Sequence, residues 1–220
     1  MKIEGRTLSV LKNFASINPS LLFKPGTQLR TMSPQKTILA QAVIKETIPN
    51  QFAIFDVSRF LSVLSLFQNP TLTFQETYAQ ISDGQQRVNY TFTDPTMIVV
   101  ASDKTPNVES NVSFTLSSET LSKVQKAMGV LSMPEFAVVG DGESISVQAI
   151  DSKNSVGDVF AITVGTTTHK FRMIFKAENM KMIPGDYTVN ISFKGLAHFA
   201  SEDVQYWIAA EASSTFEGTA

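Results

Sequence analysis

Apolar residues recur at helical spacing in four short segments of the chain, and strand-like runs separate these segments. The predicted helices begin near Arg6, Val57, Ser118 and Ala177, so successive starts are 51, 61 and 59 residues apart. This near-regular spacing is typical of one small unit repeated four times. A unit of one strand, one helix and three strands cannot bury its apolar face alone, so we expect the four units to pack against one another.

The four predicted helices differ in how much of their circumference is apolar. In the first, residues 6–17, apolar side chains fill one arc of the helical wheel and polar ones fill the other. The second, residues 57–68, is apolar around most of its circumference, and its narrow polar face consists of Ser58, Ser62 and Ser65. The third, residues 118–130, is two-sided again, and the short fourth, residues 177–182, ends before a Pro-Gly pair.

Alternating and β-branched runs between the helices predict strands, and turn residues separate them. In the first half we predict strands at residues 21–24, 28–32, 38–44, 52–55, 72–75, 78–82 and 87–92. In the second half we predict them at residues 112–116, 135–139, 144–150, 159–164, 170–175, 187–193, 196–201 and 204–210. The polar segment 101–110 is the best linker candidate. The sequence therefore predicts an α+β fold of two similar domains, 1–105 and 106–220.

Charge follows the same division between helices and strands. The four helical segments hold six of the 18 basic residues and two of the 20 acidic ones, which leaves 12 basic and 18 acidic residues elsewhere. The predicted helices thus carry a net charge of +4 and the remainder −6. The six basic residues are Arg6, Lys12, Arg59, Lys123, Lys126 and Lys181.

Composition excludes several kinds of chemistry. The chain has no cysteine, so it can form no disulfide, cysteine-ligated metal site or thiolate nucleophile. Its first residues lack the apolar core of a signal peptide, and no apolar run is long enough for a membrane-spanning helix. A net charge of −2 alone argues against binding of nucleic acid, because clustered lysine and arginine supply phosphate affinity. The separation of charge weakens that objection.

Candidate catalytic and metal-binding residues are sparse. The two histidines, His169 and His198, lie at or within predicted strands without neighbouring carboxylate pairs, so we interpret both as structural. The sequence 140–142, Gly-Asp-Gly, predicts a hairpin turn, and no Gly-Lys-Ser/Thr follows it as a phosphate-binding loop would require. We expect no cofactor, no metal and no enzymatic activity.

Four blocks of sequence resemble the sliding clamps of T4-like bacteriophages, the processivity factors of their DNA polymerases. The blocks are LKNFASIN (11–18), AIFDVSRFLSVLSLF (53–67), ENMKMIPGDY (178–187) and WIAAEASST (207–215), in the same order and at the same spacing. The resemblance implies a DNA clamp fold in which three subunits close into a ring around duplex DNA. Twelve helices would line the hole, and sheets would form the outside.

The resemblance also implies partners and a location. A DNA polymerase would dock a short peptide into an apolar pocket bordered by the linker and the last strand, and an ATP-dependent clamp loader would open the ring. It allows a role in late transcription, in the cytoplasm of an infected bacterium. We predict that the six helical cations face DNA and that the pocket contains Val108, Tyr206, Trp207 and Ile208.

Two other classes of function remain as alternatives from the sequence. A β-rich structural protein of the virion would share the strand content and the repeats, but it would not need basic helices. A small-molecule-binding β enzyme would need convergent polar or titratable groups, which the sequence does not show.

Overall fold

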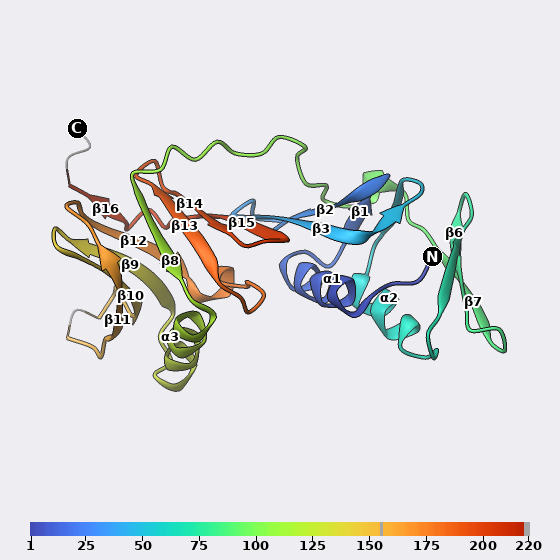
Figure 1. Cartoon of the computed structure of the whole chain (residues 1–220), viewed down its shortest axis with the longest axis horizontal. Coiled ribbons are helices and arrows are strands. Elements are labelled where there is room, and N and C mark those ends of the chain that lie inside the picture. Colours follow the sequence, from blue (N-terminus) through green and yellow to red (C-terminus); the bar gives the residue numbers. More distant parts are fainter. Residues whose placement is uncertain (155, 218–220) are drawn as a thin grey trace. The chain divides into compact units, whose positions relative to one another are not determined.

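Helices and strands follow one another in the predicted order, in two compact units, Met1–Lys104 (unit 1) and Thr105–Ala220 (unit 2). The computed structural model describes residues 1–154 and 156–217 (Figure 1). Short helices and many antiparallel strands build each unit, which confirms the predicted α+β class. Among the described helices, none is long and apolar enough to cross a membrane.

Unit 1 contains two helices and three small groups of antiparallel strands. Strand β1 pairs with β4, β2 with β3, and β6 lies between β5 and β7. The elements are α1 (Gly5–Ile17), β1 (Leu21–Phe23), β2 (Gly26–Met32), β3 (Ile38–Ile48), β4 (Phe52–Ile54), α2 (Val57–Leu64), β5 (Thr71–Phe74), β6 (Tyr78–Ser82), β7 (Arg87–Thr91) and a 3₁₀ helix (Pro95–Met97).

Unit 2 repeats the order of strand, helix and three strands more completely. Its strands form the antiparallel orders β15-β14-β13-β8 and β11-β10-β9-β12-β16. The elements are β8 (Val112–Leu116), α3 (Ser118–Val130), β9 (Glu135–Asp141), β10 (Ser144–Ile150), β11 (Phe160–Thr166), β12 (Lys170–Lys176), a 3₁₀ helix (Ala177–Asn179), β13 (Tyr187–Ser192), β14 (Leu196–Ala200), β15 (Val204–Ala209) and β16 (Thr215–Phe216).

The apolar arc of α1 packs inward as the wheel predicts. Val10, Leu11 and Phe14 are fully buried and Ile17 is nearly so, whereas Leu8 on the same arc is only half-buried. Burial of large apolar side chains is the dominant favourable term in folding. One face of the helix is therefore fixed to the strands beneath it, and the other remains available to solvent.

Carboxylates from residues far away in sequence hold the N-terminal ends of α1 and α3. Glu46 of β3 accepts hydrogen bonds from the Glu4 backbone N–H and from Thr7 Oγ1, the latter at 2.6 Å. Asp186, just before β13, accepts one from the Ser118 N–H at 2.7 Å. A negative charge at this end satisfies free N–H groups and complements the helix dipole. These contacts fix each helix to a strand far away in sequence.

The predicted fourth helix is wrong beyond its first turn. Only Ala177–Asn179 are helical, as a 3₁₀ helix, and the chain then becomes irregular. Met180, Met182 and Ile183 are all buried, so this irregular segment packs into the core. The Ile183 N–H donates to Tyr206 Oη at 3.1 Å, while Tyr187 Oη donates to the Ile183 carbonyl. Anchoring of this segment in the core outweighs the weak helical tendency of six residues.

Smaller differences concern the ends of elements. Helix α2 ends at Leu64 rather than at residue 68, because tight turns follow and Asn69 adopts a left-handed conformation with φ of 53°. Before α1, where we predicted no strand, Met1 exchanges two backbone hydrogen bonds of 2.7 Å with Leu72. Strand β16 was not predicted, since a two-residue strand has no periodicity.

Alanine substitutions at two glycines test the packing, because we expect one to lower the free energy of unfolding and the other to raise it. A Cβ at Gly140 in β9 would overlap the Phe171 ring and lie 2.7 Å from the His169 carbonyl oxygen, whereas one at Gly129 in α3 would meet nothing within 4 Å. We expect Gly140→Ala to lower the free energy of unfolding by about 1–3 kcal/mol. Gly129→Ala should raise it by about 0.5–1 kcal/mol. Urea unfolding followed by circular dichroism measures both, and equal effects would contradict this account.

Candidate nucleic-acid interface and partner surface

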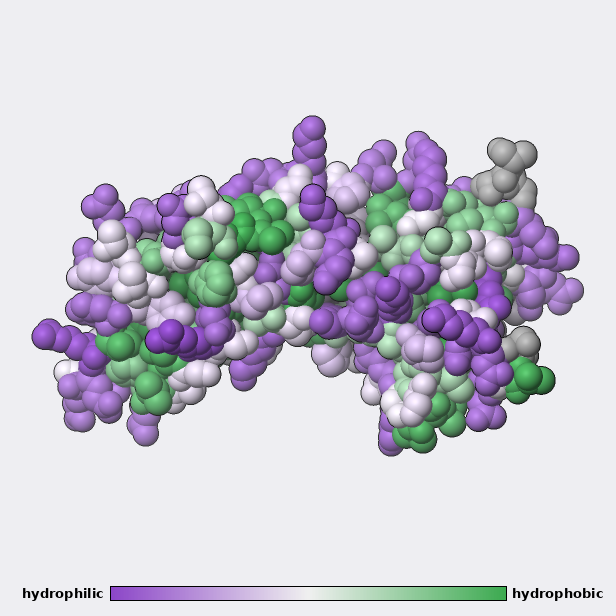
Figure 2. Space-filling model, turned by 180° about the vertical axis from the view of Figure 1, so that it is seen from behind, coloured by the Kyte–Doolittle hydropathy of each residue, from purple (hydrophilic) through white to green (hydrophobic). Residues whose placement is uncertain are grey.

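All six cations predicted to face DNA have exposed side chains. Three belong to unit 1 and three to unit 2, and five of the six lie on α-helices. On the face shown in Figure 2, polar residues cover most of the surface and apolar residues form small separate patches. Most large apolar residues of the helices are buried and the cations are exposed, so the cations lie where a polyanion can approach.

In unit 1 the candidate cations lie on two neighbouring helices. Helix α1 carries Arg6 and Lys12, and α2, which packs beside it, carries Arg59 (Figure 1). Arg59 lies in the first turn of the helix that Asp56 caps, and the Arg59 N–H donates to Asp56 Oδ1 at 2.8 Å. Its charge also acts on Tyr90, where burial raises the pKa of the phenol and the nearby guanidinium partly opposes that shift.

In unit 2 one hydrogen bond brings the remaining candidates to the same region. Gln125 of α3 donates to the Met180 carbonyl at 3.1 Å, which holds the segment with Lys181 against the helix that carries Lys123 and Lys126. The loss of the fourth helix therefore changes how Lys181 is presented and leaves its exposure intact. Contact of any of the six with DNA stays a prediction.

The three unit 2 cations are not electrostatically equivalent. Lys123 Nζ lies 2.6 Å from Glu119 Oε1, one helical turn away, and this ammonium lowers the pKa of the Glu119 carboxyl. An exposed pair of this kind contributes little stability. The carboxylate does, however, offset part of the positive charge that Lys123 offers, so Lys126 is the stronger candidate for a phosphate contact on α3.

The four residues predicted to form the partner pocket have different degrees of burial. Val108 is half-buried in the segment before β8, whereas Tyr206, Trp207 and Ile208 of β15 are buried. In a strand with one face in solvent, alternation would bury either Tyr206 and Ile208 or Trp207, but here both faces of the strand are covered. The Tyr206 hydroxyl accepts a hydrogen bond from the Ile183 N–H inside the core. The pocket assignment stays a prediction, for which Val108 is the accessible member.

Ion pairs tie both ends of the predicted linker. Lys24 Nζ contacts both carboxylate oxygens of Asp103 at 2.6 and 2.7 Å, and the Arg30 guanidinium donates to the Asp103 and Lys104 carbonyls at 3.2 and 3.1 Å. Burial lowers the pKa of Arg30, and the Asp103 charge opposes this. Near the C-terminal end of the linker, Lys194 Nζ lies 2.6 Å from Glu109 Oε2.

Both histidines take part in aromatic contacts. The His198 ring stacks on Trp207 with centroids 4.6 Å apart, and His169 meets Phe193 edge-on. In the described part of the chain, no group of three or more histidine, aspartate or glutamate residues could hold a metal ion.

Comparisons with solved structures define the fold. The chain matches a proliferating cell nuclear antigen of A. fulgidus, solved with the C-terminal region of FEN-1, with a TM-score of 0.71 and 15% identity over 94% of this chain and 96% of that one. It also matches a putative DNA polymerase III β subunit of Eubacterium rectale, with a TM-score of 0.65 and 15% identity over 96% of this chain and 62% of that one. The fold is the DNA clamp fold.

Sequence comparisons identify the family. Residues 3–100 match the model of the DNA polymerase processivity factor, and residues 113–212 match that of the gp45 sliding clamp C-terminal domain. The sliding clamp of Vibrio phage KVP40 is 31% identical over 96% of this chain and its whole own length. That of Enterobacteria phage T4 is 28% identical over 99% of this chain and its whole length. The chain therefore belongs to the family of phage sliding clamps, which are DNA polymerase processivity factors, and the predicted resemblance is confirmed.

The environment of His198, which stacks on Trp207, predicts how the free energy of unfolding depends on pH. Burial lowers the pKa of His198, while a 3.0 Å hydrogen bond with Gln205 Oε1 partly opposes this. The unfolded chain therefore takes up a proton first as the pH falls below about 6.5, so stability declines from there to the folded pKa. Urea midpoints followed by Trp207 fluorescence should fall over this range, and less so in His198→Gln. The His169→Gln variant is the control, and an identical pH dependence in all three proteins would refute the linkage.

Proposed function

We propose that three copies of this chain close into a ring around duplex DNA and hold the replicative polymerase on its template. The two units would be the two clamp domains of each subunit. The observation that carries the proposal is that, in a member of this family, all six candidate cations are exposed, while large apolar residues of each α-helix, such as Phe14, Phe60 and Val124, are buried.

The modest number of cations suits a ring that slides. A closed ring retains DNA by topology, so tight phosphate contacts are unnecessary and would oppose movement. One or two cations per helix, among serine, asparagine and glutamine, suit transient or water-bridged contacts. The acidic remainder of the chain would repel DNA from other surfaces and favour solubility.

The proposal includes partners that act on the ring. A closed ring cannot reach circular DNA unaided, so an ATP-dependent clamp loader would open it, and this chain would need no catalytic centre. The polymerase would dock near the linker, where Val108 is accessible. In this proposal the clamp acts in the cytoplasm of the infected bacterium and also takes part in late transcription. The alternative of a virion protein has no observation in its favour once the family is known.

The mass of the assembly tests the ring directly. Three subunits of 24.1 kDa would form a particle of about 72 kDa. Light scattering over a wide range of concentrations should show this mass, with dissociation only on dilution. A persistent monomer or dimer would contradict the ring, because two or four clamp domains are too few to surround a duplex.

Charge reversal tests the DNA-facing assignment. We expect Lys12→Glu, Lys126→Glu and Lys181→Glu, combined, to reduce processive synthesis about tenfold or more while the ring keeps its mass, because six added negative units per subunit would repel the phosphates. Primer extension past a single binding event, with loader and polymerase, measures this.

The matched control reverses Lys36, Lys153 and Lys170, which are exposed but lie in turns or at a strand end. It changes the net charge equally, so it separates a local effect from a global one. Normal processivity of the combined Lys12, Lys126 and Lys181 variant would contradict the assignment of these residues to the DNA-facing surface. An equal loss of processivity in this variant and in the control would contradict it as well.

A further inference from the structure

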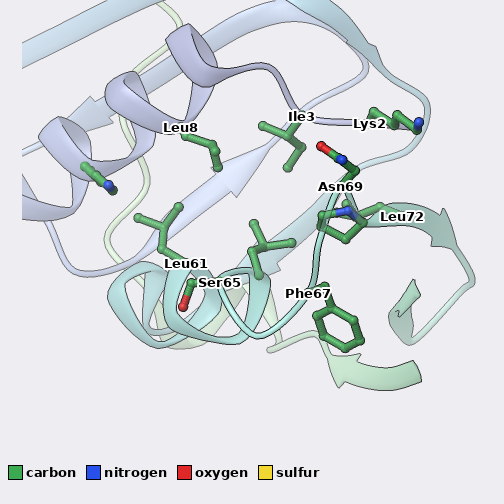
Figure 3. A pocket seen from close by; sticks show the side chains of 11 residues that line it. Lys2, Ile3, Leu8, Leu61, Ser65, Phe67, Asn69 and Leu72 are labelled. Carbon is green, nitrogen blue, oxygen red and sulfur yellow. The ribbon is translucent and has the colours of Figure 1, made fainter. Parts of the chain in front are cut away.

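An apolar groove of about 340 Å³ lies in unit 1 between α1, α2 and the start of β5. In Figure 3, Leu8 of α1 and Leu61 of α2 point toward one another across it, with Ile3 further along and Lys2 beyond Ile3. This volume lies within the range of sites that bind small molecules or a few side chains of a partner. Its lining is Lys2, Ile3, Leu8, Lys12, Leu61, Leu64, Ser65, Phe67, Asn69, Pro70 and Leu72.

The groove accounts for apolar residues that the core does not use. Helix α2 is apolar around most of its circumference, yet only Val57, Phe60 and Leu64 are buried in it. Leu61 remains half-exposed, as does Leu8 on the facing side of α1. Leu66, which lies just beyond the helix and outside the lining of the groove, is 70% exposed. Apolar surface that is left open beside a groove is typical of an interaction site.

The charge of the groove selects the kind of partner. Its two charged lining residues are Lys2 and Lys12, both exposed, and no acidic residue is among the described residues that line it. Lys12 lies one helical turn after Leu8, and Lys2 lies on the N-terminal side of it, so the two ammonium groups flank the apolar centre. Apolar side chains with carboxylates on either side would complement this arrangement.

We propose that this groove binds an acidic amphipathic segment of a partner protein, with its apolar side chains between Leu8 and Leu61 and its carboxylates on Lys2 and Lys12. The mode is that of an amphipathic helix in an apolar groove. The site lies wholly within unit 1 and is separate from the predicted pocket near Val108.

Lys12 gives the site a consequence for DNA binding. It is both a lining residue of the groove and a candidate for phosphate contact, so the acidic segment and DNA would compete for the same ammonium group. Such a partner would bind the clamp before DNA enters or after it leaves.

The test uses the full chain without DNA, so its result does not depend on the function proposed for the ring. The probe is a dye-labelled synthetic helix with leucines on one face and glutamates on the other, and fluorescence anisotropy measures its Kd. We expect Leu61→Glu and Lys12→Glu each to raise this Kd about tenfold. The control Ser62→Glu, on the exposed polar face of α2, should change it less than about twofold.

Two further measurements test which kind of partner the groove binds. A second peptide with lysine in place of every glutamate should bind at least about tenfold more weakly, because Lys2 and Lys12 would repel it. Equal binding of the two peptides, or equal Kd values for Leu61→Glu and Ser62→Glu, would overturn the proposal. So would a change in particle mass on Leu61→Glu alone, because the groove would then be a contact between copies of this chain. Lys12 is exposed, so Lys12→Glu keeps the test valid if Leu61→Glu unfolds unit 1.

Discussion

Every functional feature of this chain depends on the burial of one face of a short helix against small sheets. Helices of 8 to 13 residues are marginal by themselves and hold their shape only through packing and capping. Phe14 in α1, Phe60 in α2 and Val124 in α3 are all buried, and this fixes which residues face outward. The exposed cations are a consequence of that orientation. A substitution that loosened a helix would therefore disturb the charged face as well as the core.

Much of the fold could be predicted because period and turn chemistry are local signals. The strands Val112–Leu116 and Ser144–Ile150 and the helix Ser118–Val130 match their predicted bounds. The segment after Lys176 could not be predicted, because its conformation is determined by Tyr187 and Tyr206, whose hydroxyls bond to Ile183 in the core. The caps that Glu46 and Asp186 provide were equally invisible, since each joins residues far apart in sequence.

The candidate site was predictable only in part. Exposure of Lys12 and Lys126 follows from the wheel, and the structure agrees with it. The engagement of Lys123 by Glu119 could have been read from their spacing of four residues. The double burial of β15 could not, because alternation assumes that one side of a strand meets solvent. The groove beside Leu61 had a signal in the nearly all-apolar wheel of α2, but only the structure distinguishes groove from core.

The anchored linker has a consequence for the mechanics of the subunit. Asp103 pairs with Lys24 on one side and Glu109 pairs with Lys194 on the other, so an ion pair lies near each end of the linker. Both pairs are exposed, so dissolved ions screen them strongly. Added salt therefore weakens the hold of each folded unit on its end of the linker, a hold that is already weak because exposed pairs contribute little stability.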